Sequence, residues 1–81
     1  MKKKYRDSHL YYQVAREAVQ LERDGEFDRA AKVWAKAECE SINRVNERWA
    51  RIRSDFCFYQ IVREKFRKEA EDKLLKRSAR R

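Results

Sequence analysis

The sequence predicts an all-α protein built from a helical hairpin and a long amphipathic third helix between basic disordered tails. Three observations support this fold class. The 81 residues include no proline, a single glycine and 44% charged side chains, a composition that suits amphipathic helices. Apolar residues recur at helical spacing, and the one glycine, Gly25, separates two such stretches. We therefore expect one helical domain over residues 8–72, with tails over 1–7 and 73–81.

The first helix is expected at about residues 8–24. Either Asp7 or Ser8 can cap its start, and Gly25 can adopt the left-handed conformation that ends it. Its apolar residues follow steps of four, four and three, with Tyr11 and Ala15 beside them: Leu10, Val14, Ala18 and Leu21.

A second helix is expected at about residues 26–40. Its first turn carries Glu26 and Asp28, which suit the positive end of the helix dipole. One face is formed by apolar residues, namely Ala30, Val33, Trp34 and Ala37. Because the connection at Gly25 is so short, the two helices should run antiparallel.

The third helix is expected at about residues 43–72. Ser and Asn residues over 41–46 indicate a break before it, although a continuous helix from 28 into the seventies remains the alternative. Alternating steps of three and four define a seam of about four heptads: Ile42, Val45, Trp49, Ile52, Phe56, Tyr59 and, after Arg63, Phe66 and Ala70. After Phe66 the helix becomes highly charged and should fray.

The length of this seam predicts contact with another chain. Two helices of about 15 residues cannot cover it, since a helix rises only about 1.5 Å per residue. Off-seam residues widen the apolar surface near its middle, so that both faces of the third helix require burial: Cys57, Phe58, Ile61 and Val62. We expect the hairpin on one face and a partner on the other, and a homodimer through the third helix.

The net charge of +8 lies at the two ends of the chain. Residues 7–40 carry more acids than bases, and residues 41–72 slightly more bases than acids. Direct DNA binding is therefore the less favoured alternative, in which a small basic or nucleoid-associated protein would use its tails, namely Lys2, Lys3, Lys4, Arg6, Lys76, Arg77, Arg80 and Arg81.

Two resemblances follow from longer motifs. Residues 25–37 resemble the turn and second helix of a tetratricopeptide repeat, although a single unit indicates a lone hairpin. Over most of residues 10–66 the chain also resembles the AraC Negative Regulator (ANR) family of small bacterial transcription modulators. The matching residues are Ala15, Ala18, Glu22, Gly25, Phe27, Ala30, Ala31, Trp34 and Ala37, followed by Asn46, Trp49, Ala50, Arg53, Phe56 and Cys57.

This resemblance implies a protein that binds AraC-type activators and blocks their dimerisation or DNA binding. We expect the contact at the third helix, through apolar and arginine side chains: Trp49, Ile52, Phe56, Phe58, Tyr59, Val62, Arg48 and Arg51. Trp34 is assigned to the hairpin core.

An enzyme is not expected, because the sequence offers no metal cluster, phosphate loop or activated nucleophile. Cys39 and Cys57 form no metal-binding pair, and His9 is the only imidazole, so no metal or cofactor is expected. Cys57 should behave as a small buried hydrophobe. With no long apolar segment, we expect a cytoplasmic protein that makes no membrane contact.

Overall fold

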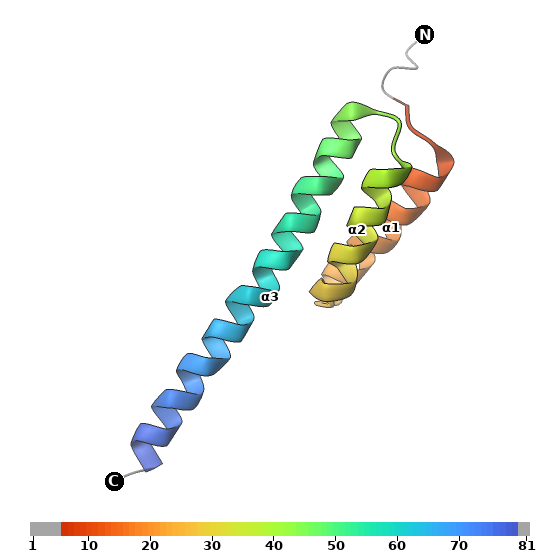
Figure 1. The fold of residues 1–81 in the computed structure, drawn as a ribbon. Coiled ribbons are helices and arrows are strands. Elements are labelled where there is room, and N and C mark those ends of the chain that lie inside the picture. Colours follow the sequence, from red (N-terminus) through yellow and green to blue (C-terminus); the bar gives the residue numbers. More distant parts are fainter. Residues whose placement is uncertain (1–5, 80–81) are drawn as a thin grey trace.

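The computed structural model describes residues 6–79, and within this range the chain forms three helices and no strand (Figure 1). These are α1 (His9–Arg23), α2 (Phe27–Glu40) and α3 (Arg44–Ala79). The predicted all-α fold is confirmed: α1 and α2 form the hairpin, and a long third helix follows it. The predicted starts and ends agree to within about a residue, except at the end of α3.

Local sequence signals set the boundaries of α1. The Ser8 hydroxyl accepts a hydrogen bond from the Tyr11 backbone N–H at 3.0 Å and so caps the helix start. After Arg23 the chain turns through Gly25, whose φ of +78° lies in the left-handed region that favours glycine. The Gly25 and Glu26 amides donate to carbonyls of the last turn of α1, which closes the corner before α2 begins.

The core lies where α1 and α2 meet each other and the first half of α3. Its buried residues are Tyr11, Val14, Ala18, Leu21, Ala30, Trp34, Ala37, Ala50 and Cys57. Trp34 is only 2% exposed and occupies the core position predicted for it. On α1 the predicted stripe residues Val14, Ala18 and Leu21 are buried, but Tyr11 is buried in place of Leu10, which is 42% exposed.

A true break separates α2 from α3, so the alternative of one continuous helix is wrong. Ser41 has extended backbone, and the Asn43 side-chain oxygen accepts hydrogen bonds from the Val45 and Asn46 amides at 2.8 and 3.2 Å. This geometry caps α3 at its N-terminus. Ile42, predicted as the first seam residue, lies in the turn and is 79% exposed.

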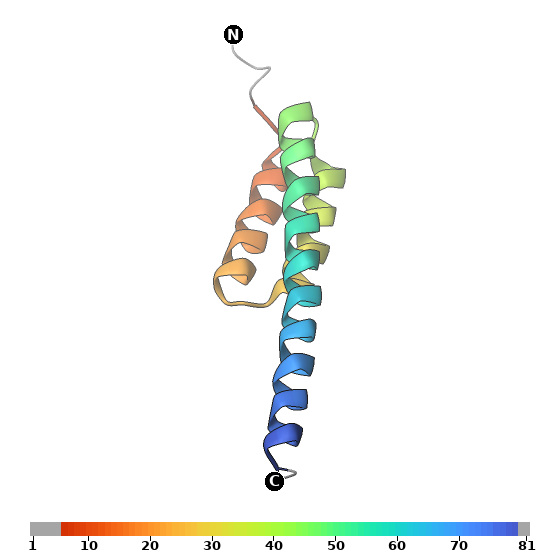
Figure 2. The same ribbon diagram turned by 90° about the vertical axis from the view of Figure 1, so that its left-hand side faces the viewer.

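Helix α3 extends well past the hairpin. Figures 1 and 2 show α1 and α2 beside its first half only, and Cys57 is the last buried residue along it. The 36 residues of α3 span about 54 Å, and the molecule measures 70 × 18 × 16 Å. Its radius of gyration of 17.7 Å exceeds the roughly 12 Å typical of a compact domain of this length.

The predicted fraying after Phe66 and the disordered tail over 73–81 are therefore wrong for residues up to Ala79, which are helical. No glycine or proline interrupts this stretch, and Arg67 forms ion pairs with Glu64 and Glu71 at helical spacing. The remaining predicted tail residues, 1–5 and 80–81, lie outside the described part of the chain. Among residues 6–79, no helix is long and apolar enough to cross a membrane.

Candidate protein-binding face of the third helix

One face of α3 packs against the hairpin. Ala50 and Cys57 are fully buried on it, seven residues or two turns apart. Between them, the Ser54 hydroxyl donates a hydrogen bond to the Ala31 carbonyl of α2 at 2.9 Å. The small side chains Ala50, Ser54 and Cys57 allow α2 and α3 to approach closely.

A second face of α3 carries the predicted seam and points away from the hairpin. Its central residues, here called the α3 stripe, are Trp49, Ile52, Phe56 and Tyr59, with exposures of 50, 52, 38 and 69%. Their spacing of three, four and three residues places them on one side of the helix. Within residues 6–79 no other element covers this side, so the α3 stripe is an uncovered apolar surface.

The structure separates two predicted contact residues from the α3 stripe. Phe58 follows Phe56 by two positions, and residues so spaced do not share a face of a helix. Phe58 is 62% exposed and Val62 is partly buried, one turn further along. These two residues form a separate apolar patch on another side of α3.

Arg53 connects the α3 stripe to the hairpin. Its guanidinium lies 4.2 Å from the centre of the Phe56 ring and 5.6 Å from that of the Trp49 ring, within cation–π range. The same guanidinium forms a partly buried ion pair with Glu22 of α1, and its Nε donates to Glu22 at 3.3 Å. One arginine therefore holds two stripe aromatics in place relative to the helical hairpin.

Glu22 is the centre of this network, because its carboxylate also accepts a hydrogen bond from the Trp34 indole N–H. Burial acts to raise the pKa of Glu22, but hydrogen bonds from Arg53 and Trp34 and the charge of Arg53 outweigh it and hold the pKa below its ordinary 4.5. Burial, followed by the charge of Glu22, raises the pKa of the Cys57 thiol to about 11. A thiol that remains protonated in this way is a poor nucleophile.

The predicted arginines lie on the flanks of the α3 stripe. Arg48 and Arg44 line a shallow hollow together with Trp49, Ile52 and Val45. Arg51 is directed toward α2, where its guanidinium forms an ion pair with Glu38 at 2.9 Å. Arg48 is thus placed next to the stripe, whereas Arg51 contacts the hairpin.

Asp7, considered above only as a helix cap, instead joins the chain before α1 to the α2–α3 turn. Its carboxylate accepts hydrogen bonds from the Ser41 hydroxyl at 2.6 Å, the Ile42 amide at 2.8 Å and the Asn46 side chain at 3.1 Å. Burial alone would raise the pKa of Asp7, but these hydrogen bonds together lower it below its ordinary 3.8. Sequence reasoning missed this cluster, since its members lie more than 30 residues apart.

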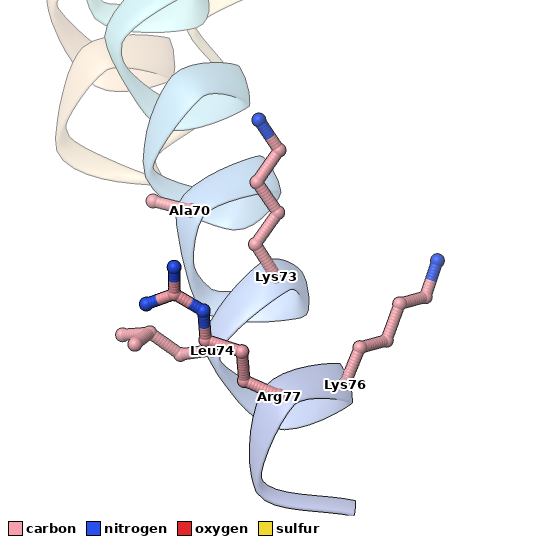
Figure 3. A pocket seen from close by; sticks show the side chains of 5 residues that line it. All are labelled: Ala70, Lys73, Leu74, Lys76 and Arg77. Carbon is pink, nitrogen blue, oxygen red and sulfur yellow. The ribbon is translucent and has the colours of Figure 1, made fainter. Parts of the chain in front are cut away.

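The basic residues of the DNA-binding alternative are only partly described. Figure 3 shows the end of α3, where Lys76 and Arg77 project from a helix that also carries Ala70 and Leu74. Arg6 is exposed before α1, while Lys2, Lys3, Lys4, Arg80 and Arg81 lie outside the described residues. Lys76 and Arg77 are about 50 Å along α3 from its N-terminal end, where Arg44 lies, so they form no patch with Arg44.

In the part of the chain that the structure describes, no group of three or more His, Cys, Asp or Glu side chains could hold a metal ion. No protein-family model matches the sequence, and neither the curated proteins nor the solved structures include a significant match.

Proposed function

We propose that this chain is a non-enzymatic negative regulator of transcription, which binds an AraC-type activator through helix α3. The observation that carries the proposal is the uncovered α3 stripe, Trp49, Ile52, Phe56 and Tyr59, on a helix anchored to a packed hairpin. The activator as target comes from the resemblance to the ANR family. No cofactor is required for this role.

The anchoring supports a role in binding. Trp, Tyr and Arg are enriched among the residues that dominate binding energy at protein interfaces, and the α3 stripe exposes Trp49 and Tyr59. Arg53 holds the Trp49 and Phe56 rings through its guanidinium, so these rings lose little side-chain freedom when a partner covers them. An amphipathic helix presented in this way fits a hydrophobic groove between the helices of a partner.

The proposed mechanism is competition for the surface through which the activator dimerises. The α3 stripe would fill the apolar groove, and Arg48 at its edge would orient the helix against acidic side chains. Arg51, already paired with Glu38, would contribute less. An activator left as a monomer keeps half of its phosphate contacts and loses orders of magnitude in affinity for DNA.

We also propose that the chain self-associates. The seam predicts a homodimer, and the α3 stripe is the surface on α3 that such a dimer would use. Phe58 and Val62 lie on another side of α3, so the proposed contact does not include them. Direct DNA binding by the basic residues is the alternative function, and the same experiment tests it.

The test uses purified AraC-type activators, each bound to its fluorescein-labelled promoter site at about physiological salt. We expect this protein to lower the anisotropy of at least one activator–DNA complex while leaving the anisotropy of bare DNA unchanged. Binding to bare DNA, with a steep loss of affinity as salt increases, would instead support the nucleic-acid alternative. Release of no activator at protein concentrations up to about 100 µM would contradict the proposal.

A further inference from the structure

The second half of α3 poses a physical problem. Beyond Cys57 no described residue of the helix is buried, and Phe66, Leu74 and Leu75 are 64, 61 and 68% exposed. In proteins most of the stability of a helix comes from packing of its apolar face rather than from intrinsic helix propensity. The surface ion pairs of Arg67 with Glu64 and Glu71 offer weak support, since both lie in solvent. A projecting helix of this kind requires a partner.

The uncovered apolar area is large enough for a specific interface. Trp49, Phe56, Tyr59 and Phe66 are 50, 38, 69 and 64% exposed. With about 200 Å² for each aromatic side chain, these four alone leave roughly 450 Å² per chain uncovered. A standard interface buries about 800 Å² per partner, so the aromatics supply more than half of it before Val45 and Ile52 are included.

The seam pattern identifies a second copy of α3 as the occupant. Heptad spacing from Val45 to Ala70 is typical of pairing with another helix of the same kind. The seam contains one charged position, Arg63. In a parallel pair, Arg63 would face the same arginine of the other chain at the centre of the contact, which is unfavourable.

An antiparallel pair avoids this clash. When the two antiparallel helices overlap along their full length, each residue faces a residue of the other chain such that the two residue numbers sum to about 122. Arg63 then lies opposite the partner's Tyr59, and Phe66 lies opposite the partner's Phe56. An arginine beside an aromatic ring and two facing aromatics are both favourable.

The charges favour the same direction. The end of α3 carries Lys73, Lys76 and Arg77 without an acid between them, and Figure 3 shows these side chains extending from it. In an antiparallel pair they approach the start of the other α3 and the end of α2, where the charges of Glu40 and Glu47 offset those of Arg44 and Arg48. A parallel pair would bring the two basic ends together. Opposed helix dipoles add to this preference.

We infer that α3 pairs with α3 of a second copy in antiparallel orientation, centred near residue 61, so that self-association covers the α3 stripe. The pair itself is independent of the proposed function. Its regulatory consequence rests on that function, because an activator and a second copy then compete for the same surface. The unpaired chain would be the active form.

Spin labels measure the orientation. In a Cys39→Ser, Lys76→Cys variant the remaining native thiol, Cys57, is fully buried and does not take the label. Labels at position 76 of an antiparallel pair lie about 45 Å apart along the axis, since 30 residues separate them. A parallel pair would place them within about 25 Å. We expect the long distance by double electron–electron resonance, and a short distance would overturn the inferred orientation.

Sedimentation at about 100 µM measures whether the pair forms. We expect the wild-type chain at twice its mass of 10.0 kDa and Phe56→Glu as a monomer. Phe58→Glu is the matched control, because it makes the same change at a more exposed residue away from the α3 stripe and should stay dimeric. Circular dichroism verifies folding, and Ile52→Asp replaces Phe56→Glu if that variant unfolds. A monomeric wild type, or equal loss in both Phe variants, would overturn the inference.

The two proposals fail in different ways. A long label distance and a dimer mass, without release of any activator from DNA, would refute the proposed function and leave the antiparallel pair standing. Activator release by a chain that is monomeric at every concentration would refute the pair alone. Competition predicts that the fraction of activator released rises less than linearly with concentration once dimers form.

Discussion

Removal of the Glu22 carboxylate should destabilise the fold more than removal of any other single charge. In Glu22→Ala the Arg53 guanidinium loses its only described carboxylate partner, and the Trp34 indole N–H loses its acceptor. The side chains of Arg53 and Glu22 are 26% and 13% exposed, so the pair is largely shielded from water. Both the hairpin core and the anchor of α3 depend on this one carboxylate.

The magnitude follows from this partial burial. Removing one partner from a buried ion pair costs about 3–5 kcal/mol. Arg53 can move part of its guanidinium into water, so we expect a lower cost of about 2–3 kcal/mol. A domain of this size has a total stability of roughly 4–12 kcal/mol. The melting temperature should therefore fall by roughly 10–20 °C.

The assay is urea unfolding followed by circular dichroism at one fixed protein concentration, because self-association also changes apparent stability. Glu26→Ala is the control. Glu26 forms an exposed ion pair with Arg29 at 3.1 Å, and its loss should cost at most about 0.5 kcal/mol. Equal stability of Glu22→Ala and Glu26→Ala would refute the anchoring role of the Glu22 network.

Three further predictions concern Asp7, pH and the thiols. Asp7→Ala should lower the free energy of unfolding, measured in urea, by about 1–3 kcal/mol, and it should accelerate hydrogen exchange of the Ile42 amide, because it removes the acceptor of that amide. Unchanged exchange at Ile42 would show that Asp7 does not hold the α2–α3 turn. Because the pKa values of Asp7 and Glu22 are lower in the folded chain than in the unfolded chain, their ionised carboxylates stabilise the fold. This stabilisation is present in full above about pH 4.5 and is lost as the pH falls through the pKa values of the folded chain. Unfolding midpoints at pH 7 and pH 3 should therefore differ less in the Asp7→Asn, Glu22→Gln variant than in the wild type, and an equal difference would contradict these assignments. A thiol reagent at pH 8 should modify exposed Cys39 within minutes and leave buried Cys57, whose pKa is about 11, unmodified until the chain unfolds; equal rates would contradict the burial of Cys57.

Much of the fold could be predicted because its signals are local. Gly25, Ser8 and the apolar spacing of α1 and α2 mark those helices within a few residues of sequence. The heptad spacing also identified the side of α3 that remains uncovered. The seam is longer than α1 or α2, so these two helices cannot cover its whole length. Trp34 was placed correctly, since a large aromatic between two small residues one turn away suits a helix crossing.

The connections between helices could not be predicted in the same way. The partners Glu22 and Arg53 are 31 residues apart, and the contacts of Asp7 span 34 to 39 residues. Nothing in local spacing selects one carboxylate among fourteen. The end of α3 was misjudged for a different reason: its high charge resembles a tail, whereas pairs such as Glu64 with Arg67 at helical spacing support a helix.

The central claim is that the α3 stripe is the surface that binds the activator. It is tested most directly by comparing Ile52→Asp with Phe58→Asp in the release of an activator from its labelled promoter site. Both variants add one negative charge at an exposed apolar residue of α3, and only Ile52 belongs to the α3 stripe. We expect Phe58→Asp to release the activator within about threefold of the wild-type concentration, and Ile52→Asp to require at least tenfold more, a difference of about 1.4 kcal/mol. Equal activity of Ile52→Asp and the wild type would contradict the claim.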